Sequence, residues 1–290
     1  MLAARDGRAL YEVAAEREAR GGSALPVVTD VADERAVWEL ARRAVERFER
    51  IDVWVNNAGV MAYGRFEDTP AEACRRVLEV SLLGQIHGAR AALRQFRAQG
   101  SGVLVNVSSL YAKLTMPYVS AYVASKYALL GLSRCLRQEV RDAAGIHVCV
   151  VLPGVVDTPI FRHAANWTGR AVTAAPPIVD PQRVVRAIVR CARRPRPEIS
   201  VGQTARAMAL VQAVLPRLYE RVASPVMDRI AFRDQPAPPT TGNLFAPRPG
   251  TAGVRGGYRR ARTAAWRAAA ATSTALATAS LYAVRRRAQR

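Results

Sequence analysis

Two kinds of apolar pattern alternate along residues 1–203. Short runs rich in β-branched residues predict buried strands, and longer stretches with apolar residues every three or four positions predict amphipathic helices. Strands are expected at 1–6, 25–29, 51–55, 103–107, 146–152 and 198–201, and helices at 7–20, 33–50, 70–99, 118–143 and 181–194. Because the strands alternate with helices, we predict an α/β fold in which helices cover both faces of a doubly wound parallel sheet.

The pattern changes after residue 203. Residues 204–232 predict an amphipathic helix broken at Pro216 and Pro225, and the stretch 235–257 is rich in Pro, Gly and Thr, which is typical of a linker. Residues 268–284 carry no charge and lie between flanking arginines. We therefore divide the chain into a domain over 1–203, a helical extension over 204–234, and a linker with an Arg/Ala-rich tail over 235–290.

The positive charge is concentrated towards the C-terminus. The net charge is +20, and after Asp234 the chain has ten arginines and no acidic residue. Such a tail is typical either of contact with an anionic surface, lipid or nucleic acid, or of a solvated segment in an arginine-rich protein. Few aromatic residues interleave with these arginines, which disfavours a specific nucleic-acid partner.

The uncharged run 268–284 leaves three alternatives open: a mobile Ala-rich helix, a helix docked on the sheet edge or a partner, and a membrane-surface anchor with basic flanks. We favour the first two over the anchor. A peripheral membrane contact through the tail therefore stays open.

Cysteine and histidine usage argues against a metal site. The four cysteines lie far apart without paired spacing, and the three histidines form no cluster. This pattern predicts buried cysteines in a reducing, cytoplasmic compartment, with neither a disulfide framework nor a metal centre.

The candidate chemistry lies near the middle of the chain. Ser109 follows the apolar run 103–107, and Tyr122 and Lys126 are four residues apart in the next predicted helix, on one face. An ammonium next to a phenol favours the phenolate, so we expect Lys126 to lower the pKa of Tyr122. Of the 43 basic residues only Lys113 and Lys126 are lysines, which makes a lysine at this position notable.

Several motifs in this order resemble the short-chain dehydrogenase/reductase family. They are the 13- and 4-residue spacing of Ser109, Tyr122 and Lys126, the Asn-Asn-Ala-Gly run at 56–59, the Pro-Gly segment at 153–158, and the acidic pair Asp30-Val31. The resemblance covers about residues 1–203. It implies a dinucleotide-binding fold in which Tyr122 is the acid or base, Lys126 holds the nicotinamide ribose and Ser109 hydrogen-bonds the substrate oxygen.

The resemblance also implies which residues bind the cofactor. Arg5 matches the position just after the family's second strand, where a basic residue would meet a 2′-phosphate, and this favours NADP(H) over NAD(H). The implied cofactor-binding residues are Arg5, Asp30, Val31, Asn57, Ala58, Gly59, Tyr122, Lys126, Pro153, Gly154, Val156 and Thr158.

Two departures from the family pattern are informative. No Gly-x-Gly run precedes Arg5, so we expect an N-terminally shortened chain without the family's first strand. The strands at 1–6, 25–29 and 51–55 would then lack their shared hydrogen-bonding neighbour. Ser81 stands where the family usually has an asparagine that supports proton relay, and its shorter hydroxyl predicts a slower relay.

These features leave two functional hypotheses. The first is an NAD(P)-dependent oxidoreductase acting on an apolar carbonyl or alcohol. The second is a degenerate, non-catalytic relative that acts through binding. A homo-oligomer through the helices at 70–99 and 118–143 is the default. The apolar loop residues expected near the substrate are Leu110, Tyr111, Met116, Tyr118, Ile160, Phe161 and Trp167.

Overall fold

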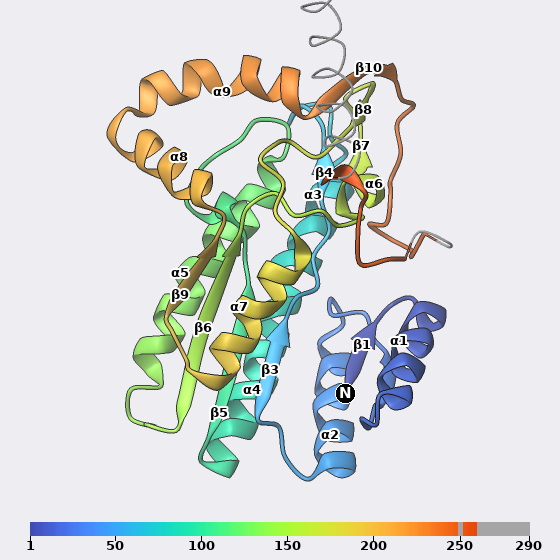
Figure 1. The fold of residues 1–290 in the computed structure, drawn as a ribbon, viewed down its shortest axis with the longest axis vertical. Coiled ribbons are helices and arrows are strands. Elements are labelled where there is room, and N and C mark those ends of the chain that lie inside the picture. The colour runs from blue at the N-terminus through green and yellow to red at the C-terminus, as the bar shows by residue number, and fades with distance from the viewer. Residues whose placement is uncertain (249–251, 260–290) are drawn as a thin grey trace, which may run out of the picture.

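The centre of the molecule is a parallel sheet of four strands in the order β3–β5–β6–β9. The structure is a computed structural model that describes residues 1–248 and 252–259, without the side chains of 203–207. The strands are β3 (Val53–Asn56), β5 (Gly102–Val107), β6 (Ile146–Pro153) and β9 (Glu198–Val201). All their pairings are parallel, and Figure 1 shows helices on both faces of this sheet. The predicted α/β fold is therefore confirmed.

The two faces follow from the alternation of side chains along β5. Val103 and Val105 pack with α7 (Pro181–Arg193) in one cluster. Leu104, between them, packs on the other face against α4 (Gly84–Gln99) and the end of α5 (Ser120–Glu139). Successive strand residues point to opposite faces, so a continuous apolar run such as 103–105 requires helices on both sides.

The N-terminal residues form a separate unit beside β3 (Figure 1). β1 (Leu2–Ala4) pairs in parallel with β2 (Pro26–Val28), and α1 (Gly7–Ala19) packs against them. α2 (Glu34–Phe48), capped by Asp33, packs against α4. In the described residues no strand pairs with both β1 and β3.

The long helix predicted at 70–99 is divided into three pieces. α3 (Ala71–Leu78) leads into a π-helical turn, η1 (Glu79–Leu83), and then into α4. Gly88 allows α4 to approach the end of β3, because a Cβ there would overlap the amide oxygen of Asn56. That oxygen accepts a hydrogen bond from Trp54 Nε1 at 2.7 Å.

Short elements that the sequence patterns do not predict lie beyond the carboxyl ends of the central strands. Figure 1 shows most of them above β3 and β6. They are β4 (Ala62–Tyr63), the 3₁₀ turn η2 (Leu110–Ala112), α6 (Ile160–His163), β7 (Ala165–Asn166), β8 (Arg170–Val172) and β10 (Phe232–Pro236). Periodicity cannot identify elements of two to five residues.

The residues after β9 form a helical hairpin and a packed strap. α8 (Gln203–Val214) and α9 (Pro216–Ile230) meet at Pro216, the predicted break. The second predicted break is wrong, because Pro225 lies inside α9. Its position is exposed, so water can hydrate the carbonyl that proline leaves without a donor.

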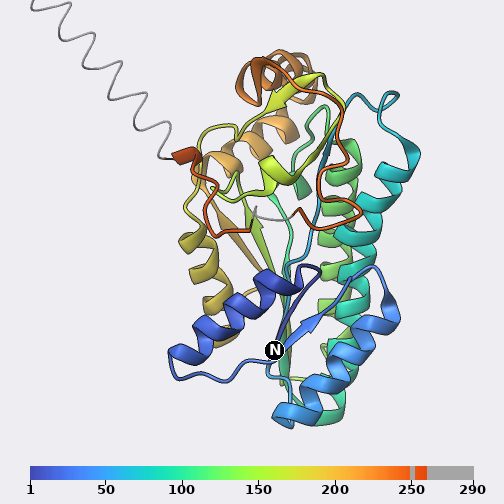
Figure 2. The same cartoon turned by 90° about the vertical axis from the view of Figure 1, so that its right-hand side faces the viewer.

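The predicted linker instead packs against the domain. We call residues 237–248 and 252–259 the C-terminal strap. Leu244 in the strap is fully buried, and Thr240 and Asn166 exchange backbone hydrogen bonds of 3.0 and 2.8 Å. Figure 2, turned by 90° from Figure 1, shows the strap running down from the α8–α9 end towards the N-terminal unit. The Pro- and Gly-rich composition thus predicts correctly that the segment is irregular, but the segment packs against the domain.

Candidate active site

A cavity of about 410 Å³ opens beyond the carboxyl ends of β5 and β6. Ser109, Tyr122 and Lys126 all line it. Ser109 lies just after β5, and Tyr122 and Lys126 lie one turn apart in α5. Loops at the carboxyl ends of parallel strands are the usual binding positions in such sheets. The structure therefore brings the predicted catalytic residues together in one site.

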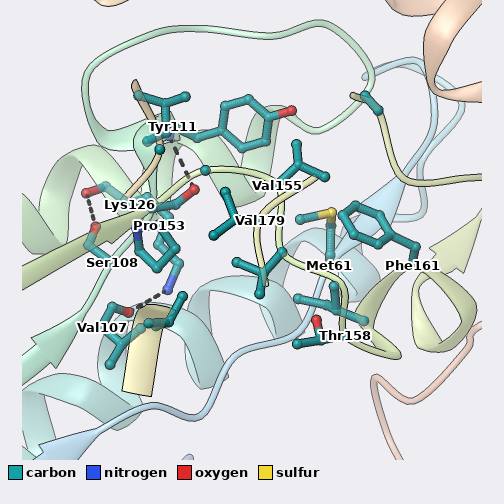
Figure 3. A pocket seen from close by; sticks show the side chains of 18 of the residues that line it. Met61, Val107, Ser108, Tyr111, Lys126, Pro153, Val155, Thr158, Phe161 and Val179 are labelled. Carbon is teal, nitrogen blue, oxygen red and sulfur yellow. Dashed lines mark hydrogen bonds between the residues drawn. The ribbon is translucent and has the colours of Figure 1, made fainter. Parts of the chain in front are cut away.

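Hydrogen bonds hold these three side chains in place. Ser109 Oγ accepts the backbone N–H of Tyr111 at 3.2 Å, and the Ser109 and Tyr122 side chains hydrogen-bond each other. Lys126 Nζ donates to the backbone oxygen of Val107 at 3.3 Å, as Figure 3 shows. The backbone oxygen of Lys126 accepts the Ser108 hydroxyl at 3.3 Å, which joins α5 to the end of β5.

Burial governs the pKa values of the pair. It raises the pKa of Tyr122 to about 12, although the hydrogen bond from Ser109 acts in the opposite direction. It lowers the pKa of Lys126 to about 8. The expectation that Lys126 lowers the pKa of Tyr122 is wrong for this arrangement, because burial penalises the charged form of each group. Nζ lies 5.3 Å from the centroid of the Tyr122 ring, and burial is the main cause of the pKa shift of both groups.

One group of predicted cofactor-binding residues lines the same cavity. They lie at the end of β6 or in the turns that follow β3 and β6, and they are Asn57, Gly59, Pro153, Gly154, Val156 and Thr158. Ala58 does not line the cavity, but its backbone oxygen accepts a hydrogen bond from Gln85 at 3.3 Å. The structure brings these residues close to Lys126, and their role in binding stays a prediction.

A second group lies away from the cavity, against the C-terminal strap. The guanidinium of Arg5 donates to the backbone oxygens of Asn243, at 2.5 Å, and Leu244, at 2.8 Å. Arg76 also donates to Leu244, at 3.0 Å, and forms an ion pair with Asp30. The strap thus accepts hydrogen bonds from two of the five N–H donors of Arg5, the residue that the sequence predicts to meet a 2′-phosphate.

Asp30 and Val31 are held by the surrounding helices. The pKa of Asp30 lies below its usual value: burial raises it, but the backbone N–H of Ala32 and the guanidinium of Arg76 outweigh burial. The backbone oxygen of Val31 accepts a hydrogen bond from His87 Nδ1 at 3.0 Å. These contacts stabilise the turn before α2 whether or not a cofactor binds.

Ser81 is buried and does not line the cavity. Its hydroxyl accepts the backbone N–H of Val60 and donates to the backbone oxygen of Val60, both at 3.1 Å. A Cβ at Gly59 would lie 3.7 Å from Ser81 Oγ and 3.8 Å from Lys126 Nζ. Ser81 therefore lies just behind Gly59, near the lysine, with both hydrogen-bonding functions directed to Val60.

Sequence reasoning missed Gln85, one turn after Ser81. Its side-chain Nε2 lies 3.4 Å from the backbone oxygen of Val107, the same oxygen that accepts from Lys126. Its Oε1 is buried, and no donor among the described residues reaches it. The four-residue spacing from Ser81 places both on one helix face, which is the signal that could have identified it.

The cavity wall is mostly apolar, and much of it comes from helices that the sequence did not connect with the site. Of the seven apolar loop residues expected there, Tyr118 and Trp167 do not line the cavity and the other five do. Figure 3 shows Met61, Val155, Val179 and Phe161 along one side. The residues from α7, α8 and α9 are Pro181, Val184, Val185, Ile188, Met208, Met227 and Ile230.

The nicotinamide end of a dinucleotide fits this cavity better than the diphosphate end. Lys126 donates to a single acceptor among the described residues, which leaves ammonium donors for ribose hydroxyls, and Gly59 places no side chain beside them. For the diphosphate, a glycine-rich turn at a helix N-terminus is the usual cradle. Among residues 1–59 the glycines are Gly7, Gly21, Gly22 and Gly59, and none forms such a turn after β1, β2 or β3 in the structure.

Other predicted features can be placed only in part. Within residues 1–248 and 252–259, no group of three or more His, Cys, Asp or Glu side chains is arranged to hold a metal ion. Over the same residues, no helix is long and apolar enough to cross a membrane.

Arg255 and Arg259 at the start of the tail pair with Asp180, the N-cap of α7. The predictions for 268–284 lie outside the described residues.

Comparison with known proteins gives consistent results. Residues 1–169 match the short chain dehydrogenase family. The uncharacterized oxidoreductase YxnA of Bacillus subtilis is 31% identical over 242 residues, 82% of this chain and 68% of that protein. The probable oxidoreductase EphD of Mycobacterium tuberculosis is 37% identical over 232 residues, 75% of this chain but only 39% of that protein.

A solved structure shows the same arrangement. A short-chain dehydrogenase/reductase from Burkholderia phymatum, crystallised in complex with NAD, has a TM-score of 0.68 and 25% sequence identity. The similarity covers 75% of this chain and 84% of the Burkholderia chain. It therefore extends beyond the catalytic segment to most of the α/β domain.

Proposed function

Because the chain belongs to the short-chain dehydrogenase family, we propose that it is an oxidoreductase that transfers hydride between a nicotinamide cofactor and an apolar carbonyl or alcohol. The observation that carries the proposal is the joint placement of Ser109, Tyr122 and Lys126 in one cavity with Asn57 and the turn after β6. The mainly apolar wall supports an apolar substrate, since apolar pockets with few polar groups orient such ligands.

Each polar group has a distinct task in this proposal. When bound, the nicotinamide supplies or takes the hydride. Tyr122 keeps its proton at neutral pH because burial raises its pKa to about 12, so it is suited to donate that proton to a carbonyl oxygen. Ser109 hydrogen-bonds the same oxygen, and Lys126 holds the ribose hydroxyls.

The Tyr122 hydroxyl can be tested directly. We expect Tyr122→Phe to lower kcat/KM for NADPH-dependent reduction of apolar ketones by about 10²–10⁴-fold, the range for loss of a general acid. Tyr127→Phe is the matched control, because Tyr127 is five residues further along α5 and is 39% exposed. Equal activity of the wild type and Tyr122→Phe would contradict the assigned role.

For the cofactor we propose NADP(H), with NAD(H) as the alternative, because Arg5 follows β1 at the position expected to meet a 2′-phosphate. If so, Arg5→Ala should weaken NADPH binding by about tenfold, a loss of about 1.4 kcal/mol, and leave NADH binding unchanged. Arg8→Ala, an exposed position in α1, is the control. Equal weakening of both cofactors would mean that Arg5 acts only by holding the strap.

A non-catalytic function is the second candidate, because the strap engages Arg5 and no glycine-rich turn at a helix N-terminus follows β1, β2 or β3. A thermal-shift titration of the full chain with NADPH and NADH separates the two. A ligand that binds the folded state raises the melting temperature by mass action. If neither cofactor raises the melting temperature, binding without catalysis is the better account.

A homo-oligomer through the helices at 70–99 and 118–143 stays a prediction that sedimentation velocity would test.

A further inference from the structure

The outer surface of the α8–α9 hairpin is unusually apolar. Leu210 and Val214 are 65% and 66% exposed, and they belong to a run of such residues. The described residues contain eighteen exposed large hydrophobic side chains, and seven of them lie in this hairpin. The seven are Leu210, Val211, Val214, Leu215, Leu218, Val222 and Val226. We call them the outer apolar stripe, and clustering of this kind marks an interaction surface.

Helical spacing places the α9 part of the stripe on one face of that helix. Leu218, Val222 and Val226 are four residues apart and share a face of α9. The adjacent face, roughly a quarter-turn further round the helix, carries Tyr219 and Met227, which are buried. A helix that is apolar on two faces is normally covered on both, but within the described chain only the inner face of α9 is covered.

The hairpin is attached so that the stripe stays outside. Tyr219 Oη donates to the backbone oxygen of Thr115 at 2.6 Å. Gln212 accepts the backbone N–H of Thr115 at 2.8 Å and donates to its hydroxyl at 2.9 Å. These bonds join both helices to the loop after η2. The hairpin therefore cannot roll over to bury the stripe without breaking them.

Positive charge borders the stripe. Arg217 and Arg221 lie one turn apart on α9, next to Leu218 and Val222, and Arg229 lies near its C-terminal end. All three are exposed and form no ion pair with any other described residue. Glu220 is the only acidic residue between Leu210 and Val226. An apolar stripe with arginine at its border is typical of helices that lie in a lipid interface.

We propose that the outer apolar stripe docks on an anionic lipid surface, with Arg217 and Arg221 meeting the headgroups. The helices have 12 and 15 residues, shorter than the ~20 residues that span a bilayer, so they would lie along the surface. Two-fold packing of a second copy would instead add the same arginines to the interface with only Glu220 of the stretch 210–226 to match them. Charge complementarity therefore favours lipid.

The α8–α9 hairpin also forms part of the wall of the active-site cavity. Met208 of α8 and Met227 and Ile230 of α9 line the cavity that holds Tyr122. The same two helices thus separate the cavity from the proposed lipid surface. Figure 1 shows them at one end of the molecule, beyond the carboxyl ends of the central strands. An apolar molecule dissolved in the membrane would have a short path to the cavity.

Vesicle co-sedimentation of the full chain tests the docking. The probes are vesicles of phosphatidylcholine alone and vesicles of phosphatidylcholine with phosphatidylserine. We expect Leu218→Gln/Val222→Gln to weaken binding to the anionic vesicles by at least about tenfold, because it removes two apolar contacts. The control Tyr11→Gln/Val13→Gln changes two exposed apolar residues of α1 and should bind like the wild type. Arg217→Gln/Arg221→Gln should reduce the preference for anionic vesicles.

Three results would overturn the proposal. The first is equal vesicle binding by the wild type and Leu218→Gln/Val222→Gln, which would assign the binding to other residues. The second is no vesicle binding by the wild type. The third is a wild-type oligomer that this variant dissociates in sedimentation velocity, which would assign the stripe to a second copy. Because the test measures binding without cofactor or substrate, it is independent of the proposed enzymatic activity.

Discussion

Lys126 and Tyr122 share a helix face, but their ionisation depends on what surrounds that face. In α5 both side chains are buried between the end of β5 and the cavity. Each therefore shifts towards its neutral form. The four-residue spacing places the two side chains close together, whereas their burial decides whether each side chain is charged. The same spacing at the surface would leave both groups near their ordinary pKa values.

The lowered pKa of Lys126 predicts a pH-dependent stability. The pKa is about 8 in the folded chain, against an ordinary value of 10.5. Between these values the unfolded chain binds a proton that the folded chain does not, so the free energy of unfolding should rise with pH. We expect Lys126 to contribute a rise of about 2 kcal/mol between pH 8 and 10.

Urea unfolding at the two pH values measures this contribution. Lys126→Met should lose the rise, because methionine does not titrate. Lys113→Met is the matched control, since Lys113 is the only other lysine and lies partly exposed beside Glu198. An undiminished rise in Lys126→Met would show that other groups cause it.

At the scale of elements, the π-helical turn η1 decides where Ser81 points. The apolar spacing predicts a long helix over 70–99, with one part ending near residues 83–84. The extra residue per turn in η1 changes the direction of the side chains, and Ser81 reaches the backbone of Val60 with two hydrogen bonds. Such a turn depends on contacts with residues distant in the chain, so spacing alone does not reveal it.

We expect Ser81→Ala to lower the free energy of unfolding by about 1–3 kcal/mol, because it leaves the buried N–H and C=O of Val60 without partners. Chemical denaturation at neutral pH measures the change. Ser120→Ala, at the exposed first residue of α5, should change stability little. If Ser81→Ala is as stable as the wild type, the two bonds to Val60 do not hold the turn.

At the scale of the whole molecule, the sheet is divided into two parts. β1 and β2 pair only with each other, whereas β5 is paired on both sides by β3 and β6. Every residue of β5 is buried, but β1 and β2 together contain one buried residue, Val27. Two-stranded sheets with little burial are marginal on their own, so this unit depends on α2 packing against α4 and on the contacts of Arg5.

Native-state hydrogen exchange should therefore resolve two units. We expect the amides of Leu2 and Thr29, which donate across β1 and β2 at 2.9 Å, to exchange faster than those of Val105 and Val150. Local opening of the N-terminal unit exposes less apolar surface than global unfolding does. Equal protection in both units would mean that the molecule opens as a single cooperative body.

The sequence by itself determined the α/β alternation and the meeting of Ser109, Tyr122 and Lys126. These depend on periodicity, on a hydroxyl at the end of a strand and on one helical turn, all of which are local properties. The tertiary structure alone decided three further features: the raised pKa of Tyr122, the engagement of Arg5 by the strap, and the lining of the cavity by α8 and α9. Each arises from contacts between residues far apart in the chain. A local sequence pattern does not show which distant residues will pack against it.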